Sequence, residues 1–489
     1  MSDVDIGLRP AHVLAQAIRN RELSSRELLD HYLARVDKLN APLNAVVTLD
    51  PDGARSAADE ADRALARGEI RGSLHGVPMT IKDTFETAGM RTTAGFEPWD
   101  HVSDGDAEAV RRLRDAGAVI FGKTNTPTLA GDWQTFNPIF GTTNNPWDTS
   151  RTSGGSSGGS AVATATGMTA FELGSDIAGS IRVPSSWCGV CGHKPSWGVV
   201  PQRGHVPPPP GALADSDLSV VGPIARTIED VELAFDIIAG PAGHQAVGWR
   251  LELPPARATT LSELRLATWL DEASFPVQAD VREVLEAAVS RLRDAGAVIT
   301  DARPEISMPD VLRTYLELLY PVILGTIPQK RFDSMAALAD ALPVEDDGQL
   351  ARTARFATLR HRDWLFANAR RERLRVQLAD YFRDVDAVLM PTTVVPAIPH
   401  DHSEPFTSRT IDVDGAGRPY TDLFGWIALA TVAYLPATVV PIGRTDEGLP
   451  VGIQIVGPYL EDRTTLAVGR CVAEAMGGFV APPMPEIAN

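Results

Sequence analysis

Cysteine is scarce in this sequence, which limits the roles that sulfur can play. Three cysteines, Cys188, Cys191 and Cys471, occur among 489 residues. They are too few and too unevenly spaced for the disulfide framework of a small secreted protein. Cys188 and Cys191 have the spacing of a redox or zinc motif, but no second pair lies nearby to complete a metal site. We therefore expect buried free thiols, no metal ion and a reduced, cytoplasmic compartment.

Long apolar runs and an excess of positive charge are also missing. No stretch of about 18 uncharged apolar residues occurs, so no membrane-spanning helix is expected. The first 16 residues lack a basic region followed by an apolar run, so no secretory signal is expected. Lysine and arginine total 45 against 63 acidic residues, a net charge of −18. Because this field repels phosphate backbones and anionic lipids, we expect neither a nucleic-acid nor a membrane partner.

The composition is that of a large globular chain, with 44% apolar and 22% charged residues. Apolar residues recur every three or four positions in 9–40, which predicts helices, and Ser24 is placed to cap the second at Glu27. Short apolar runs at 77–81 and 118–122 predict buried strands. Strand and helix patterns keep alternating along the chain. This alternation predicts an α/β/α sandwich around a mixed, mostly parallel sheet covered by helices.

Residues 303–380 differ from the rest of the chain. They have a helical period, many arginines and no strand pattern. We expect a helical insertion here that caps the core, although a solvated helix face would explain the arginines equally well.

The stretch SGGSSGGSA at 153–161 has several interpretations. A phosphate-binding loop would end in Gly-Lys-Ser or Gly-Lys-Thr, which is absent here. A flexible linker is disfavoured because 161–168 follow as a buried type of helix. The G-x-S-x-G pattern of α/β-hydrolases is matched twice, but the preceding residues 147–152 do not form a hydrophobic strand.

A fourth interpretation joins this loop to GSDIAGSIR at 174–182. Small residues let the backbone turn tightly, so that successive N–H groups converge as in an oxyanion hole. A serine at the end of such a turn could attack a bound carbonyl if a base activates it. Lys82 ends a predicted buried strand, where desolvation would lower its pKa from roughly 10.4. Pairing of Lys82 with Asp83 or another acid is the alternative, and none of the ten histidines stands in a recognisable triad order.

Several motifs in this order resemble those of the amidase signature family. They are GVPMTIKD at 76–83, GKTN at 122–125, NNPW at 144–147, GGSSGGSA at 154–161, GSDIAGSIR at 174–182 and CGVCGHKP at 188–195. VGPIAR at 221–226 and PVGIQ at 450–454 are similar to later family motifs. The resemblance implies the amidase signature fold, with one amidase domain over 1–489, a signature core at about 70–240 and a variable helical cap at about 303–380.

The resemblance also implies a catalytic set of Ser180 as nucleophile, Lys82 as base and Ser156 as bridging serine, with a cis peptide before Ser156. Lys82 would accept a proton from Ser180 through Ser156, and Ser156 would return a proton to the leaving amine. The oxyanion donors would be the backbone N–H groups of Ile177, Ala178, Gly179 and Ser180. No cofactor is implied.

Position 178 departs from the family, which usually has glycine there. If the turn needs a positive φ at this position, Ala178 would carry strain and tilt one donor. Ala130 and Gly131 align with bulkier residues of the animal fatty acid amide hydrolases, so we expect an acyl pocket open to aromatic groups. Trp133 and Gly155 complete the predicted substrate-binding residues.

The remaining pocket walls are expected from 203–215, 303–350 and 420–436. Five aromatic side chains are candidates for the lining, with core packing as the alternative for each. They are Trp133, Tyr315, Tyr320, Phe332 and Trp426.

These features predict a free-standing amidase that hydrolyses small carboxylic amides as a monomer or homodimer. The family's breadth extends the expectation to anilides, esters and carbamates (urethanes). The alternative is the glutaminase subunit of a tRNA-dependent amidotransferase, which the 303–380 segment and the proline run at 207–210 do not resemble. A non-catalytic binding protein is disfavoured because Lys82, Ser156 and Ser180 are all present in register.

Overall fold

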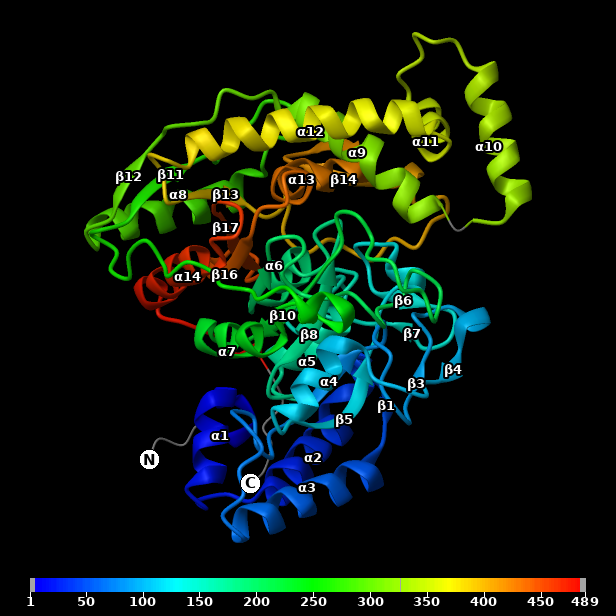
Figure 1. Cartoon of the computed structure of the whole chain (residues 1–489). Coiled ribbons are helices and arrows are strands. Elements are labelled where there is room, and N and C mark those ends of the chain that lie inside the picture. The colour runs from blue at the N-terminus through cyan, green and yellow to red at the C-terminus, as the bar shows by residue number, and fades with distance from the viewer. Residues whose placement is uncertain (1–4, 326, 484–489) are drawn as a thin grey trace.

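A mixed eight-stranded sheet forms the centre of the molecule, and the computed structural model describes residues 5–325 and 327–483 (Figure 1). The strand order is β12-β11-β13-β17-β16-β9-β10-β8. In chain order the strands are β8 (Glu172–Asp176), β9 (Cys191–Lys194), β10 (Val220–Ala225), β11 (Arg265–Thr268), β12 (Val298–Thr300), β13 (Ala387–Pro391), β16 (Ala437–Arg444) and β17 (Pro450–Val456). Helices cover both faces, which confirms the predicted α/β sandwich.

The mixed character of the sheet is confirmed, but the expectation that it is mostly parallel is wrong. Among the described strands of this sheet, β11 pairs in parallel with β12 and β13. The pairs β13–β17, β17–β16, β16–β9, β9–β10 and β10–β8 are antiparallel. Alternation of helices and strands predicts layers but not strand direction. Here β10 inserts between β8 and β9 after a long loop, and β16 and β17 form a hairpin.

Neighbouring residues of β9 show which helices cover each face. Gly192 faces α6 (Arg182–Cys188), where an added Cβ would lie 2.3 Å from Ser185 Oγ. His193 points to the other face, and its Nε2 lies 3.2 Å from a carboxylate oxygen of Asp462. Because strand side chains alternate between faces, α6 lies opposite α14. α5 (Gly158–Ala165) packs beside α6, whereas α7 (Ile228–Ile238) and α8 (Ala279–Asp294) pack beside α14 (Asp462–Met476).

A smaller sheet of order β1-β5-β2 carries the predicted lysine strand. Every residue of β2 is buried, as its continuous apolar run predicts, and β2 is parallel to β5. The helix α2 begins with the predicted capping box between Ser24 and Glu27. The elements of this region are α1 (Ala11–Arg19), α2 (Ser25–Leu43), β1 (Val46–Leu49), α3 (Pro51–Ala66), β2 (Pro78–Lys82), β3 (Arg91–Thr92), β4 (His101–Val102), α4 (Glu108–Asp115), β5 (Val119–Thr124), η3 (Thr128–Ala130), β6 (Phe136–Asn137) and β7 (Gly141–Thr142).

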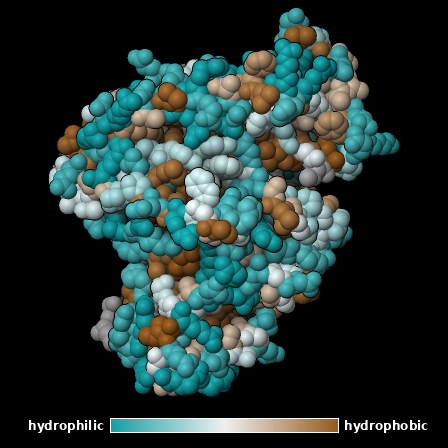
Figure 2. Space-filling view, viewed as in Figure 1, coloured by the Kyte–Doolittle hydropathy of each residue, from teal (hydrophilic) through white to brown (hydrophobic). Residues whose placement is uncertain are grey.

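The predicted helical insertion is confirmed as four helices, α9 (Met308–Leu324), α10 (Gln329–Ala341), α11 (Gln349–Ala357) and α12 (His361–Tyr381). The helix α9 packs on α13 (Phe424–Val432), and α10 projects from the body of the molecule (Figure 1). The short ribbon of β14 (Thr410–Val413) and β15 (Ala416–Pro419) precedes η6 (Tyr420–Leu423) and α13. On the face shown in Figure 2, which is mostly hydrophilic, apolar residues gather near α10 and α11.

The arginines of the cap differ in exposure, and Arg352, Arg355, Arg370 and Arg375 are half-buried. Arg360, Arg362 and Arg373 are exposed, as a solvated helix face requires. Arg371 is buried, and its Nη1 donates to both carboxylate oxygens of Asp217 at 2.9 and 2.8 Å. The cap is therefore tethered to the loop that precedes β10.

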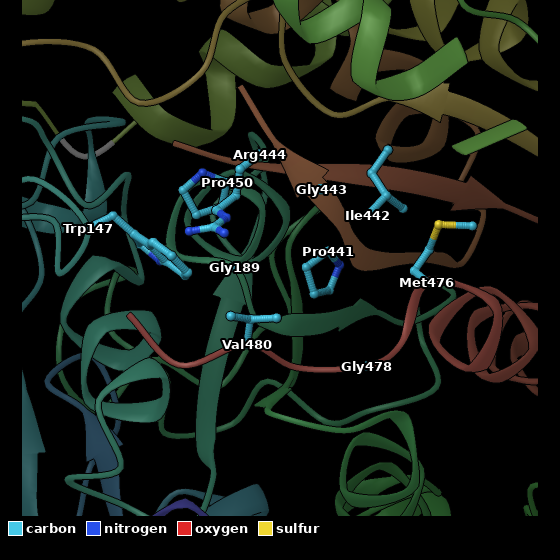
Figure 3. Close-up of a pocket in the computed structure, with 10 residues that line it drawn as sticks. All are labelled: Trp147, Gly189, Pro441, Ile442, Gly443, Arg444, Pro450, Met476, Gly478 and Val480. Carbon is cyan, nitrogen blue, oxygen red and sulfur yellow. The ribbon is translucent and has the colours of Figure 1, made fainter. Parts of the chain in front are cut away.

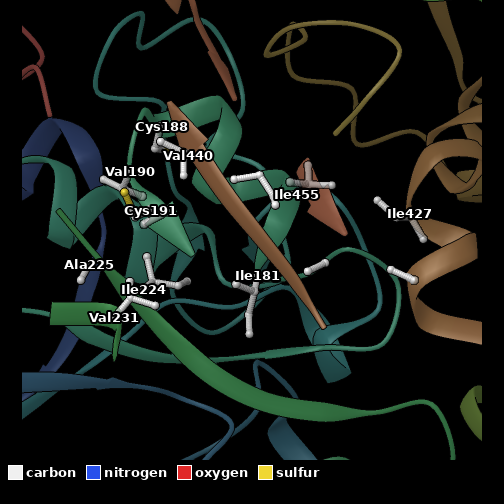
Figure 4. Close-up of a cluster of buried hydrophobic side chains, with 14 of the residues drawn as sticks. Ile181, Cys188, Val190, Cys191, Ile224, Ala225, Val231, Ile427, Val440 and Ile455 are labelled. Carbon is white, nitrogen blue, oxygen red and sulfur yellow. The ribbon is translucent and has the colours of Figure 1, made fainter. Parts of the chain in front are cut away.

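The apolar core runs beneath α6 and contains all three cysteines, each of them buried and free. Cys188 and Cys191 lie beside side chains such as Val190 and Val231 (Figure 4). Burial raises the pKa of both thiols, which keeps them protonated and unreactive. The expectation of buried free thiols is confirmed.

Candidate active site

Lys82 lies at the end of β2 and contacts three serine hydroxyls. Its Nζ lies 2.7 Å from Ser156 Oγ, 3.0 Å from Ser157 Oγ and 3.0 Å from Ser175 Oγ. Ser156 and Ser157 come from the glycine–serine loop, whereas Ser175 lies in β8. The predicted base is therefore placed where three segments distant in the sequence meet.

Burial decides the charge of Lys82. The side chain is fully buried, and desolvation lowers its pKa to about 7, although the carboxylates of Asp176 and Glu172 act in the opposite direction. The alternative pairing with Asp83 is wrong. Asp83 accepts hydrogen bonds from Thr93 and lies 3.6 Å from Lys123 Nζ.

The glycine–serine loop is a buried, fixed segment that leads into α5. The peptide between Gly155 and Ser156 is cis, as the family resemblance implies. The carbonyl of Ser156 accepts a hydrogen bond from Thr126 Oγ1 at 3.1 Å. Gly155 packs against the backbone of 132–134, where an added Cβ would lie 2.5 Å from the Asp132 carbonyl oxygen. Close backbone packing, rather than a linker function, explains the glycine here.

Ser180, the predicted nucleophile, follows a turn that the carboxylate of Asp176 organises. This carboxylate accepts the N–H groups of Gly179 at 2.9 Å and Ile181 at 3.1 Å, and the Nε of Arg182 donates to it at 3.0 Å. Burial raises the pKa of Asp176, but the Arg182 guanidinium outweighs burial and lowers it to about 2. Asp176 therefore stays charged.

Sequence reasoning quoted Asp176 and Arg182 within the motif but gave them no role. The signal was present, since an acidic and a basic residue flank a glycine-rich turn at a spacing of six. It also missed Ser157 and Ser175, because serines in a serine-rich loop cannot be ranked without knowing which hydroxyls face Lys82.

The predicted oxyanion donors differ in availability. The N–H groups of Ile177, Ala178 and Ser180 make no hydrogen bond within the described part of the chain. The prediction is corrected at Gly179, whose N–H already donates to Asp176 and is not free to bind an oxyanion. The turn places its positive φ of 86° at Gly179, and Ala178 is not among the residues with positive φ. The departure at Ala178 therefore costs no left-handed strain.

The glycine–serine loop and the segment of Ser180 are joined by a backbone hydrogen bond. The N–H of Ser157 donates to the carbonyl of Ser180 at 3.2 Å. No hydrogen bond joins the hydroxyls of Ser156 and Ser180 in the described structure. A rotation about the Cα–Cβ bond of either serine would change that hydroxyl's direction without moving the backbone.

The four predicted substrate-binding residues differ in their exposure to solvent. Ala130 is half-buried and Gly131 is exposed, and a Cβ added to Gly131 would contact only the Thr128 carbonyl, at 3.3 Å. Trp133 and Gly155 are buried, and the Trp133 indole donates to the Ala178 carbonyl at 2.6 Å.

The other aromatic candidates are mostly buried. Tyr315 donates its hydroxyl to the Ile177 carbonyl at 2.8 Å, so it contacts the same turn as Trp133. Tyr320 and Trp426 pack in the core, as the alternative for these residues predicted. Phe332 lies half-buried on the projecting helix α10.

A surface pocket lies away from these residues, at the far end of α6 (Figure 3). Trp147, Gly189 and Arg444 are among the residues that line it, and the Arg444 guanidinium carbon lies 5.3 Å from the centre of the Trp147 ring. Gly189 ends α6, whereas Ser180 precedes that helix. The pocket therefore belongs to a different region from the predicted catalytic residues.

Two further observations apply to residues 5–325 and 327–483. No helix in these ranges is long and apolar enough to cross a membrane. Within the same ranges, no three or more His, Cys, Asp or Glu side chains are grouped so that they could hold a metal ion.

Comparison with known proteins identifies the family. The Amidase family profile matches residues 27–466. One glutamyl-tRNA(Gln) amidotransferase subunit, from Acidothermus cellulolyticus, is 33% identical, and the match covers 96% of this chain and 95% of that protein. A crystal structure of an amidase is 29% identical with a TM-score of 0.77, covering 96% of this chain and all of that one. A 6-aminohexanoate cyclic dimer hydrolase solved with substrate is 25% identical with a TM-score of 0.76, covering 96% and 98%.

The chain therefore belongs to the amidase family and has the amidase signature fold. It is an enzyme that hydrolyses amide-type C–N bonds, as the family and the solved neighbours show.

Proposed function

We propose that this enzyme hydrolyses carboxylic amides through an acyl-enzyme on Ser180, with Lys82 as base and Ser156 as the bridge between them. The observation that carries the proposal is the 2.7 Å contact between the buried Lys82 Nζ and Ser156 Oγ, beside the turn that ends at Ser180. A rotation that brings the two serine hydroxyls together completes the relay. Apo enzymes often need such tightening when substrate binds.

The protons balance in each half of the reaction. Neutral Lys82 accepts the Ser156 proton while Ser156 accepts the Ser180 proton, and Ser180 Oγ attacks the carbonyl carbon. The tetrahedral oxyanion is held by the free N–H groups of Ala178, Ser180 and Ile177. The C–N bond then breaks as the proton returns through Ser156 to the leaving nitrogen. Water repeats the sequence on the ester and regenerates Ser180.

The three contacts of Lys82 would satisfy the three donors of an ammonium, and they also fit a neutral amine. Such an amine has two N–H donors, for Ser157 Oγ and Ser175 Oγ, and one lone pair, which can accept the Ser156 hydroxyl proton. An ammonium would have three donors and no acceptor, so it could not remove a proton.

The test is a substrate panel of amides, anilides, esters and carbamates with the purified enzyme. Ser180→Ala should abolish turnover, and Lys82→Met should lower kcat by about 10²- to 10⁴-fold, the usual worth of a positioned base. A Ser180→Ala enzyme that keeps the wild-type rate would overturn the proposal.

A second candidate is a glutaminase function within an amidotransferase. It is favoured by the 33% identity to relatives whose name describes one subunit of such an enzyme. The acidic net charge of −18 speaks against direct tRNA binding by this chain. We favour an enzyme that acts on a small molecule, and the assay of the purified chain decides whether it works alone or, as the name of these relatives states for them, as one subunit of a larger enzyme. Purified chain that hydrolyses glutamine but no anilide, ester or other amide would favour the second candidate.

A further inference from the structure

Two buried aromatic donors hold the carbonyls of the predicted oxyanion turn. The Tyr315 hydroxyl donates to the Ile177 carbonyl at 2.8 Å, and the Trp133 indole donates to the Ala178 carbonyl at 2.6 Å. Tyr315 has no exposed surface and Trp133 is 4% exposed. Within the described residues, these two side chains are the hydrogen-bond donors that reach the carbonyls of two successive peptides from outside the turn.

Peptide geometry converts these bonds into an orientation of the N–H groups. Both peptides are trans, so each carbonyl points opposite the N–H of the same planar unit. Tyr315 thereby directs the Ala178 N–H away from the cap. Trp133 holds the Ala178 carbonyl and so directs the Gly179 N–H away from the indole and toward Asp176, which accepts it at 2.9 Å. The Ala178 N–H is thus left free with a defined direction.

The two aromatic rings are themselves held by neighbours. The Phe424 ring centre lies 4.5 Å from that of Trp133 and 5.7 Å from that of Tyr315, in edge-to-face arrangements. Trp133 also packs against Tyr420, whose hydroxyl donates to Asp132 Oδ1 at 2.7 Å. This packing restrains both rings beside the carbonyls to which they donate.

We propose that Tyr315 and Trp133 are positioning residues that fix the predicted oxyanion turn. Tyr315 sets the direction of the free Ala178 N–H, Trp133 holds the next peptide against Asp176, and Tyr315 couples the cap helix α9 to catalysis. The inference rests on the proposed acyl-enzyme function. Its consequence is that the variable cap controls the geometry of the reaction centre through one hydroxyl group, in addition to any contact with substrate.

Tyr315→Phe tests this coupling, since it removes one hydroxyl and keeps the ring. We expect kcat to fall about tenfold with KM within about twofold, because the oxyanion forms after substrate binds; complete loss of one donor costs about 10²- to 10³-fold. The inhibition constant of phenylboronic acid, whose tetrahedral adduct places an oxygen in the oxyanion site, should rise about tenfold as well.

The matched control is Tyr381→Phe, which removes a hydroxyl that donates to the Ala302 carbonyl at 2.9 Å elsewhere in the cap. This variant should keep wild-type kcat and the wild-type inhibition constant. Thermal unfolding of both variants, with active-site titration, separates a lost fraction of folded enzyme from slower turnover. Equal kcat values for Tyr315→Phe and wild type would overturn the inference for Tyr315.

Trp133→Phe provides a second measurement should Tyr315→Phe fail to fold. It should also lower kcat and weaken phenylboronic acid in parallel, whereas Trp269→Phe, which removes a donor to the Asp271 carbonyl at 3.2 Å, should change neither. Failure of the proposed function is recognised separately, by a wild-type enzyme without turnover or a Ser180→Ala enzyme without loss.

Discussion

At the scale of single residues, the proposed chemistry depends on the protonation of Lys82. Its pKa is lowered from 10.5 to about 7 by burial, and the neutral form is the one that can accept a proton. The unfolded chain therefore binds more protons than the folded one between about pH 7 and 10.5, and this group adds stability as pH rises through that window.

The rate should follow the same titration. We expect kcat/KM to rise with pH through a limb centred near 7, the pKa of Lys82, and to level off above it. Measurement from about pH 5 to 9 on a neutral anilide, whose own charge does not change, isolates the enzyme's titration. A flat profile over that range contradicts the assignment of the base.

We expect Gly131 to determine acyl selectivity, because it is predicted to border the acyl pocket. The space around it admits a side chain, because an added Cβ would meet only the Thr128 carbonyl. Gly131→Phe should lower the ratio of benzoyl- to acetylanilide turnover by about tenfold or more, within the range for a hydrophobic pocket that loses volume. Gly131→Ala is the small-residue control, and unchanged selectivity in the phenylalanine variant would refute the placement.

At the scale of elements, the glycine–serine loop depends on close backbone packing. A Cβ on Gly155 would lie 2.5 Å from the Asp132 carbonyl oxygen and 2.9 Å from the Trp133 carbonyl carbon. Gly155→Ala should therefore cost about 1–3 kcal/mol of unfolding free energy and displace Ser156, with loss of activity.

The matched control is Gly105→Ala, which lies in the open, with nothing within 4 Å of its added Cβ. Thermal unfolding and turnover of both variants check the expectation. Wild-type stability of Gly155→Ala would show that the loop can move away from 132–134.

At the scale of the whole molecule, the cap is joined to the core by the packing of α9 on α13 and by a few polar contacts. Arg371 meets Asp217 with two hydrogen bonds, and the Tyr434 hydroxyl donates to the same carboxylate. Removal of Arg371 leaves the partly buried Asp217 carboxylate without its cation, with only the hydrogen bonds from Tyr434 and the Leu218 N–H, which costs up to about 3 kcal/mol.

Arg371→Met should therefore loosen the cap while the central sheet stays folded. We expect faster hydrogen exchange and proteolysis across α9–α12, and slower turnover because Tyr315 belongs to α9. Arg373→Met, on the exposed face of the same helix, is the control. Unchanged exchange in Arg371→Met would show that apolar packing of α9 on α13 suffices.

Local physics made part of this architecture readable in advance. The strand before Lys82 is a continuous apolar run, the capping box needs only Ser24 and the nearby Glu27, and a helical period marks α9–α12. The motifs around Lys82, Ser156 and Ser180 identified the family, since motif order survives without knowledge of contacts.

Strand direction and the bonding of the oxyanion turn were decided by tertiary structure alone. Alternating elements fit parallel and antiparallel pairing equally well, so the antiparallel majority could not be predicted. The Gly179 N–H donates to Asp176. The carbonyls of Ala178 and Ile177 accept from Trp133 and Tyr315, which lie 45 and 138 residues away from them in the sequence. Such bonds form because packing brings distant donors to a turn whose carbonyls need partners, and no local pattern records that choice.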